Sequence, residues 1–326
     1  MNKVIPLHYD NRHFMKKTKI IYCLTTRGIY SELFNLCLAI VYANHYQKHL
    51  KLNTWLWNSR IKKGWEDYFD ATLDCSNNPF SAQDKVYTNE KPWIGKIYYK
   101  PKEFFSFYYR LILNDIYQIL HPHHLLTKVV FEEMRSNEFI HDILGKNAFG
   151  LLASSFKQMY ILNNNTKNVL KDMKNSLKLP DDYIGVHIRR GDKITSKEMQ
   201  EIHLEKYVNT IINYKNISSN VFIATDDTSI INDIKEKLCP HGFNIFYNSL
   251  NQSTGFNEAF FNNASKQAKR EETINVLLDM DILIHSSFFI GTYTSNLSRV
   301  VPFFLGLDKC ISLDNDWNII NSMNGM

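Results

Sequence analysis

The sequence predicts an α/β fold in two lobes, the second of which contains a doubly wound parallel sheet. The chain has 326 residues, more than one hydrophobic core usually supports, and 44% of them are hydrophobic. Its C-terminal part alternates short apolar runs with helix-length segments, the order that builds parallel sheets. We therefore expect an N-terminal α/β lobe with a helical section over residues 1–179, and a C-terminal Rossmann-like lobe over residues 180–326.

The N-terminal lobe is expected to begin with a strand, a turn and a helix. Residues 19–24 form an apolar, strand-like run, residues 25–28 form a turn, and Ser31 is a candidate N-cap for an apolar helix. The N-terminus of a helix after such a turn can bind phosphate, which makes Gly28 a candidate binding residue. An ordinary strand–helix connection is the alternative, because one glycine is a weak signal.

The rest of this lobe is rich in aromatic residues and helices. Five large rings lie between residues 51 and 75, and most are expected in the core, although such rings can also stack on a sugar or a base. They belong to Trp55, Trp57, Trp65, Tyr68 and Phe69. Residues 101–120 and 129–177 have the length and spacing of helices, with a polar break at residues 163–165. Three histidines between them are interpreted as a turn, because Pro122 disrupts the spacing that a metal site needs.

Strands and helices alternate in the C-terminal lobe. We expect strands over residues 183–188, 220–225, 243–247 and 288–291, separated or followed by helices over 203–214, 229–238, 270–284 and 295–305. Ligands of such sheets bind at the carboxyl ends of the strands. The architecture is typical of nucleotide-binding proteins, but a fold alone does not define a function.

The most informative stretch surrounds the end of the first of these strands. His187 lies inside the strand, and Arg189, Arg190, Asp192 and Lys193 follow its last residue, Ile188. Arginine is hard to bury without a partner, and its planar guanidinium binds phosphate through two hydrogen bonds. This turn therefore predicts an anion site. A structural Arg–Asp pair at the sheet edge is the alternative.

Three carboxylates of this lobe are candidate site residues. Asp226 and Asp227 follow the strand over residues 220–225, where they could orient the arginines or accept sugar hydroxyls, or Asp227 could cap the next helix. Asp279 lies within an apolar helix, where an ionised carboxylate needs a hydrogen-bond donor. The paired N–H groups of a purine would satisfy it, and so would an arginine or a backbone amide of the protein.

The last strand of the expected series leads into a second candidate phosphate site. Residues 289–296 form a strand end, a turn of Gly, Thr and Ser, and the start of a helix. Ser295 and Asn296 lie at the helix start, and Arg299 follows one helical turn later.

Composition and charge exclude several classes of function. A net charge of +5, without a long block of like charge, is too small to indicate nucleic acid and suits a small anionic ligand. The five cysteines are widely spaced and form neither a disulfide framework nor a zinc motif. No apolar run is long enough for a signal peptide or a membrane span, so a cytoplasmic protein is expected.

Taken together, these motifs resemble, in order and approximate spacing, those of the α1,6-fucosyltransferase family, glycosyltransferase family 23. This family includes the N-glycan core fucosyltransferases and bacterial enzymes that fucosylate chitin oligosaccharides. The resemblance spans roughly the whole chain and is carried by residues 28–35, 64–66, 187–193 and 224–227, and by Asp279 sixteen residues before Ser295.

The resemblance implies a GT-B-like enzyme that transfers fucose from GDP-β-L-fucose to a GlcNAc-containing glycan or oligosaccharide, with inversion, without an essential metal or other cofactor, and in α1,6 linkage. Its N-terminal lobe would be the acceptor side. The implied donor-binding residues are Gly28, His187, Arg189, Arg190, Asp279, Ser295 and Asn296. The implied catalytic residues are Arg189, Asp192, Lys193 and Glu198, supported by Tyr207, Asp226 and Asp227.

The sequence departs from the family pattern in two places. One extra residue separates Lys193 from Glu198, which makes Glu201 a substitute candidate for the general base, and Gly191 stands where the animal enzymes carry Thr. The chemistry agrees with the implied residues, because no Asp-x-Asp metal motif stands in an appropriate turn and cationic groups must then neutralise the leaving diphosphate. The alternatives are an α1,2-fucosyltransferase, which shares the His-x-Arg-Arg pattern, and a non-catalytic protein that binds a GDP-sugar or a glycan.

Overall fold

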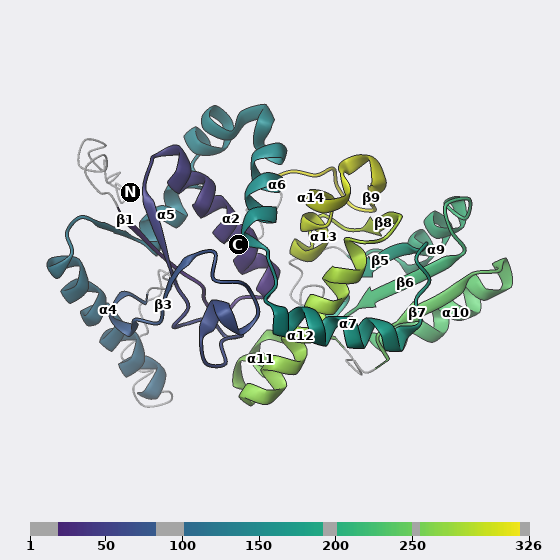
Figure 1. The fold of residues 1–326 in the computed structure, drawn as a ribbon, viewed down its shortest axis with the longest axis horizontal. Helices are drawn as coiled ribbons and strands as arrows, with labels where there is room; N and C mark the ends of the chain where they lie inside the picture. Colours follow the sequence, from purple (N-terminus) through teal and green to yellow (C-terminus); the bar gives the residue numbers. More distant parts are fainter. Residues whose placement is uncertain (1–18, 83–100, 192–200, 250–254, 320–326) are drawn as a thin grey trace, which may run out of the picture.

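The computed structural model describes residues 19–82, 101–191, 201–249 and 255–319, and Figure 1 shows two groups of strands with helices packed around each. One sheet is formed by strands between residues 19 and 126, and the other by strands between residues 184 and 312. All named strand pairs are parallel. The predicted α/β fold with a doubly wound C-terminal sheet is confirmed.

The N-terminal sheet has the strand order β3-β2-β1-β4. Its strands are β1 (Lys19–Cys23), β2 (His49–Asn53), β3 (Asp74–Ser76) and β4 (His124–Leu126). The continuous apolar run of β1 is almost wholly buried, as is typical of a central parallel strand. The other three strands were not predicted. Strand β2 contains only two apolar residues, and β3 and β4 have only three residues each.

Helix α2 (Ile29–His45) follows β1, but Ser31 is not its N-cap, so this prediction was wrong. Gly28 occupies the N-cap position, and the helix begins at Ile29. The fully buried carboxylate of Glu32 in the first turn accepts hydrogen bonds from the backbone N–H and the hydroxyl of Thr25. A carboxylate in the first turn is also favoured by the helix dipole, so the turn before α2 is fixed without a side-chain cap.

Helices dominate the remainder of the N-terminal half. They are α4 (Pro101–Leu120), α5 (Thr127–Glu133), a π-helical segment (Glu138–Leu144), α6 (Ala148–Met159) and α7 (Asn164–Leu177). The polar break predicted at residues 163–165 contains the start of α7, where the side chain of Asn163 accepts a hydrogen bond from the N–H of Thr166 at 2.8 Å. The predicted helical character of residues 101–120 and 129–177 is confirmed.

The C-terminal sheet has the order β7-β6-β5-β8-β9. Its strands are β5 (Ile184–Ile188), β6 (Asn220–Thr225), β7 (Asn244–Tyr247), β8 (Phe288–Gly291) and β9 (Cys310–Ser312). The chain builds outward from β5 in one direction and from β8 in the other, so the topological switch point lies between β5 and β8. Open α/β sheets bind ligands at this position.

The helices of this half are α9 (Leu204–Asn213), α10 (Ile231–Leu238), α11 (Glu258–Asn263), α12 (Lys266–Leu283), α13 (Asn296–Val300) and α14 (Pro302–Leu305). Helix α12 begins earlier than predicted because Ser265 caps it with a hydrogen bond from the N–H of Ala268. The helix predicted over residues 295–305 is divided into α13 and α14 at Pro302, which lacks the N–H group that a continuous helix needs.

One apolar core connects the two sheets. Phe34 of α2 stacks on Phe303 of α14 with ring centroids 6.3 Å apart. Phe156 of α6 also packs against Phe303, with ring centroids 5.6 Å apart. Figure 1 shows α6 between the two groups of strands. Because the core continues across the middle of the molecule, the lobe boundary between residues 179 and 180 stays a prediction.

The aromatic cluster of residues 55–69 is mostly core, as expected. Trp57, Trp65, Tyr68 and Phe69 are buried, whereas Trp55 is 40% exposed. Among the described residues, no helix is long and apolar enough to cross a membrane.

Candidate active site

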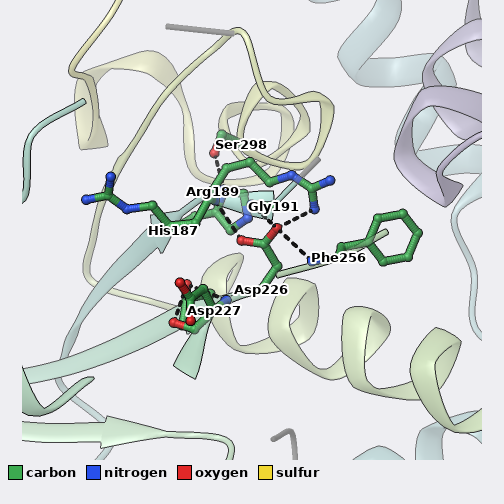
Figure 2. A network of polar contacts seen from close by, with 9 residues as sticks. His187, Arg189, Gly191, Asp226, Asp227, Phe256 and Ser298 are labelled. Atoms are coloured by element: carbon green, nitrogen blue, oxygen red, sulfur yellow. Dashed lines mark hydrogen bonds and ion pairs between the residues drawn. The ribbon is translucent and has the colours of Figure 1, made fainter. Parts of the chain in front are cut away.

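The arginine turn at the end of β5 is organised by one carboxylate, Asp226, which follows β6. Because β5 and β6 are adjacent parallel strands, their carboxyl ends lie side by side. The Asp226 carboxylate forms an ion pair with the Arg189 guanidinium at 3.1 Å and accepts hydrogen bonds from the N–H groups of Arg190 and Gly191 at 2.7 and 2.8 Å. Figure 2 shows Asp226 at the centre of these contacts. The sequence prediction that Asp226 orients an arginine of this pair is consistent with this geometry.

Asp226 also fixes a third segment, the chain around Phe256. The Phe256 N–H donates to the Asp226 carboxylate at 3.3 Å, and the Gly255 N–H donates to the Asp226 carbonyl oxygen at 2.8 Å. The Arg189 guanidinium lies 5.3 Å from the centre of the Phe256 ring, within cation–π range. The side chain of Arg189 is therefore held between a carboxylate and an aromatic ring.

Gly191 is required by close packing. A Cβ atom at this position would lie 2.6 Å from the Asp226 carboxylate and 2.6 Å from backbone atoms of Phe256. Any side chain at position 191 would therefore force the segment around Phe256 to move. The close approach of Gly191 to Asp226 and Phe256 depends on the absence of a Cβ atom.

His187 lies beneath the turn and is neutral. It is buried in β5, and its Nδ1 is 2.7 Å from the Ser298 hydroxyl on α13, a contact visible in Figure 2. Burial lowers the pKa of His187 to about 4, the charge of Arg189 acts in the same direction, and Asp226 opposes it. A neutral imidazole at the switch point can form hydrogen bonds without adding a charge.

Arg190 points to a different partner from Arg189. Its guanidinium forms an ion pair with Glu201, the substitute candidate for the base. Tyr207 of α9 is buried, and burial raises the pKa of its hydroxyl, with the charge of Arg190 opposing the shift. Asp192, Lys193 and Glu198 lie outside the described residues.

Helix α12 presents two carboxylates on one face. Asp279 is 9% exposed, and its carboxylate has no hydrogen-bond or ion-pair partner within the described ranges. Burial raises the pKa of Asp279 well above its ordinary value, and the charges of Glu272 and Asp226 raise it further. Glu272 precedes Asp279 by seven residues, two helical turns, and the pKa of Glu272 is also raised, first by burial and then by Asp226, with Arg189 opposing.

Glu272 was missed by the sequence analysis. Its seven-residue spacing from Asp279 on a predicted helix is the signal that could have identified it, since this spacing places both side chains on one face. The negative charge of Asp226 raises the pKa values of both Glu272 and Asp279, so both side chains of α12 lie within electrostatic range of the arginine turn.

The turn after β8 is clamped from two sides. The Asp314 carboxylate accepts hydrogen bonds from the N–H groups of Tyr293 and Thr294 at 2.8 and 3.0 Å, and Arg299 donates twice to the carbonyl oxygen of Tyr293 at 3.0 and 2.9 Å. Burial alone would raise the pKa of Asp314, but hydrogen bonds from Ser312, Thr294 and backbone N–H groups outweigh it, and the pKa is lowered.

This clamp holds Ser295, the N-cap residue of α13, and Asn296 at its first position beside the switch point. The sequence contained no recognisable motif for Asp314, because this residue lies 21 and 20 residues after Tyr293 and Thr294, whose N–H groups it binds.

The loop that contains Gly28 is tied to the C-terminal half. The side-chain amide of Asn58 donates to the carbonyl oxygen of Thr26 at 2.5 Å and to the side chain of Asn262 on α11 at 3.1 Å. No atom lies within 4 Å of a Cβ built on Gly28, so space is open beside this loop. The carboxyl edges of the two sheets therefore meet through Asn58.

Asp227 has a structural role in this arrangement. Its carboxylate accepts hydrogen bonds from the N–H and the hydroxyl of Ser229, at 3.0 and 2.6 Å, and caps the turn that leads into α10. This is the capping alternative that the sequence left open. The described residues contain no group of three or more His, Cys, Asp or Glu side chains that could hold a metal ion.

The two parallel sheets give the chain a GT-B-like fold, with the arginine turn beside the switch point of the second sheet. Comparisons with known proteins identify the family. Residues 33–303 match the family model of the alpha-(1,6)-fucosyltransferase N- and catalytic domains. The chain therefore belongs to the α1,6-fucosyltransferase family and is a fucosyltransferase. No curated protein sequence matches it significantly.

Solved structures of two fucosyltransferases share its fold. The structure of POFUT1 in complex with GDP-fucose has a TM-score of 0.53 and 11% sequence identity, covering 93% of this chain and 99% of POFUT1. The structure of the NodZ α-1,6-fucosyltransferase soaked with GDP-fucose has a TM-score of 0.51 and 15% identity, covering 89% of this chain and 93% of NodZ. NodZ comes from Bradyrhizobium.

Proposed function

We propose that this protein transfers fucose from GDP-β-L-fucose to a GlcNAc-containing glycan or oligosaccharide, with inversion, in α1,6 linkage and without an essential metal. The observation that carries the proposal is the arginine turn ordered by Asp226 at the switch point of the sheet, in a chain of this family. One solved structure is of POFUT1 in complex with GDP-fucose and another is of NodZ soaked with GDP-fucose, which supports the choice of donor.

Arg189 is the proposed diphosphate-binding group. As the bond between fucose and GDP breaks, negative charge develops on the diphosphate, and a cation that is already oriented stabilises this charge without reorganisation. Asp226 and Phe256 fix the Arg189 guanidinium before a ligand arrives. Arg190 is the proposed second cation, but its pairing with Glu201 makes it less available.

The nucleoside is proposed to bind along α12. Asp279 would accept hydrogen bonds from the paired N–H donors of guanine, which would offset the cost of keeping a buried carboxylate ionised. Neutral His187, Ser295, Asn296 and the Gly28 loop are proposed to line the remainder of the donor site.

The acceptor hydroxyl needs a base for a single inverting displacement. A positioned carboxylate contributes about 100- to 10,000-fold to such a proton transfer. Glu198 with Lys193 is the proposed pair, with Asp192 and Tyr207 on the acceptor side. Glu201 is the weaker candidate because its carboxylate is already engaged in an ion pair with the Arg190 guanidinium.

The experiment that tests the proposal is GDP release by the purified, EDTA-treated protein. GDP-fucose and GDP-mannose are supplied separately, each with and without a chitin oligosaccharide. We expect release from GDP-fucose only, increased by the acceptor, and linkage analysis of the product should give α1,6 rather than α1,2. Equal release from both donors, or release only after a divalent cation is restored, would contradict the proposal.

A further inference from the structure

Two exposed aromatic side chains lie at the carboxyl edge of the N-terminal sheet. Trp55 is 40% exposed and follows the end of β2, and Phe80 is 48% exposed and follows the end of β3. Strands β2 and β3 are adjacent and parallel, so both residues emerge from the same edge. The other four rings of the aromatic cluster around Trp55 are buried, and Trp55 is the exception.

The two loops that carry these rings are held by one fully buried residue, Asn53. Its side-chain oxygen accepts a hydrogen bond from the Trp55 N–H at 2.9 Å. Its amide donates to the carbonyl oxygen of Asn78 at 2.8 Å and to the Ser81 hydroxyl at 3.0 Å, on either side of Phe80. A buried polar network of this kind fixes the geometry of the side chains that it supports.

Trp55 and Phe80 together form an aromatic platform, and further contacts hold the loops that carry it. The Thr54 hydroxyl donates to the side chain of Asn77 at 2.6 Å, and Gly64 approaches Thr54 so closely that a Cβ there would lie 1.9 Å from the Thr54 hydroxyl oxygen. The Arg60 guanidinium lies 4.6 Å from the centre of the Trp55 ring, within cation–π range. These contacts hold the two exposed rings in fixed positions.

The position of the platform relates it to the donor site. Trp55 lies three residues before Asn58, which contacts the Gly28 loop and Asn262 of α11, and the Lys266 amine of α12 donates to the carbonyl oxygen of Ile61 at 3.2 Å. The loop after β2 thus reaches the half of the molecule that carries Arg189.

We infer that Trp55 and Phe80 form a sugar-stacking subsite for the acceptor, in which the rings pack against successive pyranose rings of a GlcNAc-containing oligosaccharide. This inference rests on the proposed function, because it assumes a glycan acceptor. The apolar face of a pyranose matches a preorganised aromatic ring, and rigid rings lose little entropy on binding. The neutral amides of Asn53 and Asn77 nearby suit sugar hydroxyls.

The test is calorimetry with chitotetraose in the absence of donor, using the full chain. We expect Trp55→Ala to weaken binding about tenfold, Phe80→Ala to weaken it severalfold, and Trp55→Phe to retain most of the affinity. Tyr46→Ala is the matched control, since Tyr46 is 36% exposed but precedes the amino end of β2 at the opposite edge of the sheet. GDP affinity should be unchanged in all four variants, which also shows that they are folded.

The outcomes separate the subsite from the reaction. If the protein binds chitotetraose through Trp55 but transfers no fucose, the subsite stands and the proposed function fails. If it transfers fucose while Trp55→Ala leaves both chitotetraose affinity and the acceptor KM unchanged, the subsite is wrong and the function stands. Absence of binding by the unmodified protein, or an equal loss in Tyr46→Ala, would also overturn the inference.

Discussion

The loops that carry Arg189 and Trp55, at the carboxyl edges of the two sheets, are held by different side chains. At the C-terminal sheet, the carboxylate of Asp226 holds a guanidinium and three backbone N–H groups. At the N-terminal sheet, the carboxylates of Glu32 and Asp67 also accept hydrogen bonds from backbone N–H groups, but the neutral side chain of Asn53 holds the segments around Trp55 and Phe80. A carboxylate makes stronger, charge-assisted hydrogen bonds and orients a cation, whereas an amide places loops without adding a field. Under the proposed function, this difference suits a charged donor beside Asp226 and a neutral acceptor beside Asn53.

The largest expected effect comes from Asp226→Ala. The substitution removes the acceptor of Arg189 and of the N–H groups of Arg190, Gly191 and Phe256, so the leaving diphosphate loses an oriented cation. We expect kcat/KM to fall about 100- to 1,000-fold. Asp227→Ala, in contrast, removes only a cap and should cost about 1 kcal/mol of stability. Steady-state kinetics measure the activity of the two variants, and denaturant unfolding measures their stability. Similar losses of activity in Asp226→Ala and Asp227→Ala would contradict the separate roles of the two carboxylates.

Gly191→Ala tests the packing of the same loop. The new methyl group meets the Asp226 carboxylate and the Phe256 backbone, so we expect a loss of about 1–3 kcal/mol in the free energy of unfolding, together with at least roughly tenfold slower turnover. Gly150→Ala is the control, because Gly150 lies in α6 with its nearest atom 4.0 Å from the added Cβ. This second change should stabilise the protein by about 0.5–1 kcal/mol. Equal stability of the two variants would contradict the close packing.

The pH dependence of stability tests the burial of His187. The folded pKa of about 4 lies below the ordinary value of 6.5, so the unfolded chain takes up a proton first as the pH falls. Above pH 6.5 the His187 imidazole therefore has little effect on the free energy of unfolding. The free energy of unfolding then decreases as the pH falls from 6.5 to about 4. Relative to His187→Gln, the unmodified protein should lose about 2 kcal/mol between pH 7.5 and 5. Parallel stability curves would show that His187 is accessible to protons in the folded state.

Asp279→Asn should separate stability from binding. The pKa of Asp279 is raised by burial, so above its ordinary value of 3.8 the unfolded chain releases the proton more readily and stability decreases as the pH rises. Removing the carboxyl should therefore stabilise the folded protein by about 1 kcal/mol near neutral pH and weaken GDP binding. Thermal melts at pH 5 and 8 with GDP calorimetry measure both, and a destabilised variant with normal GDP affinity would contradict this role.

Strands β5, β6 and β8 of the C-terminal half were predictable because they are buried apolar runs, whereas the half-buried, three-residue strand β9 was missed. Residues His187, Arg189 and Asp226 could be placed at one edge from sequence order alone, since parallel strands end on the same side. In the N-terminal sheet only β1 was predicted, because β2 contains just two apolar residues and β3 and β4 are too short to show a period.

Long-range contacts account for most of what the sequence could not show. Asp314 reaches back to the turn after β8, and Asn58 joins loops from both halves of the molecule. Such contacts depend on the assembled sheets and leave no local pattern. Ser31 was misassigned for a related reason: Glu32 reaches back to Thr25 and fixes the entry to α2 without a capping hydroxyl.

The proposed role of Arg189, which Asp226 orients, is to bind the diphosphate. Calorimetry with GDP and with guanosine, in the unmodified protein and in Arg189→Ala, tests this role. We expect the unmodified protein to prefer GDP by about 100-fold or more, and Arg189→Ala to lose most of this preference while it retains its affinity for guanosine. An undiminished preference for GDP in Arg189→Ala would contradict this role.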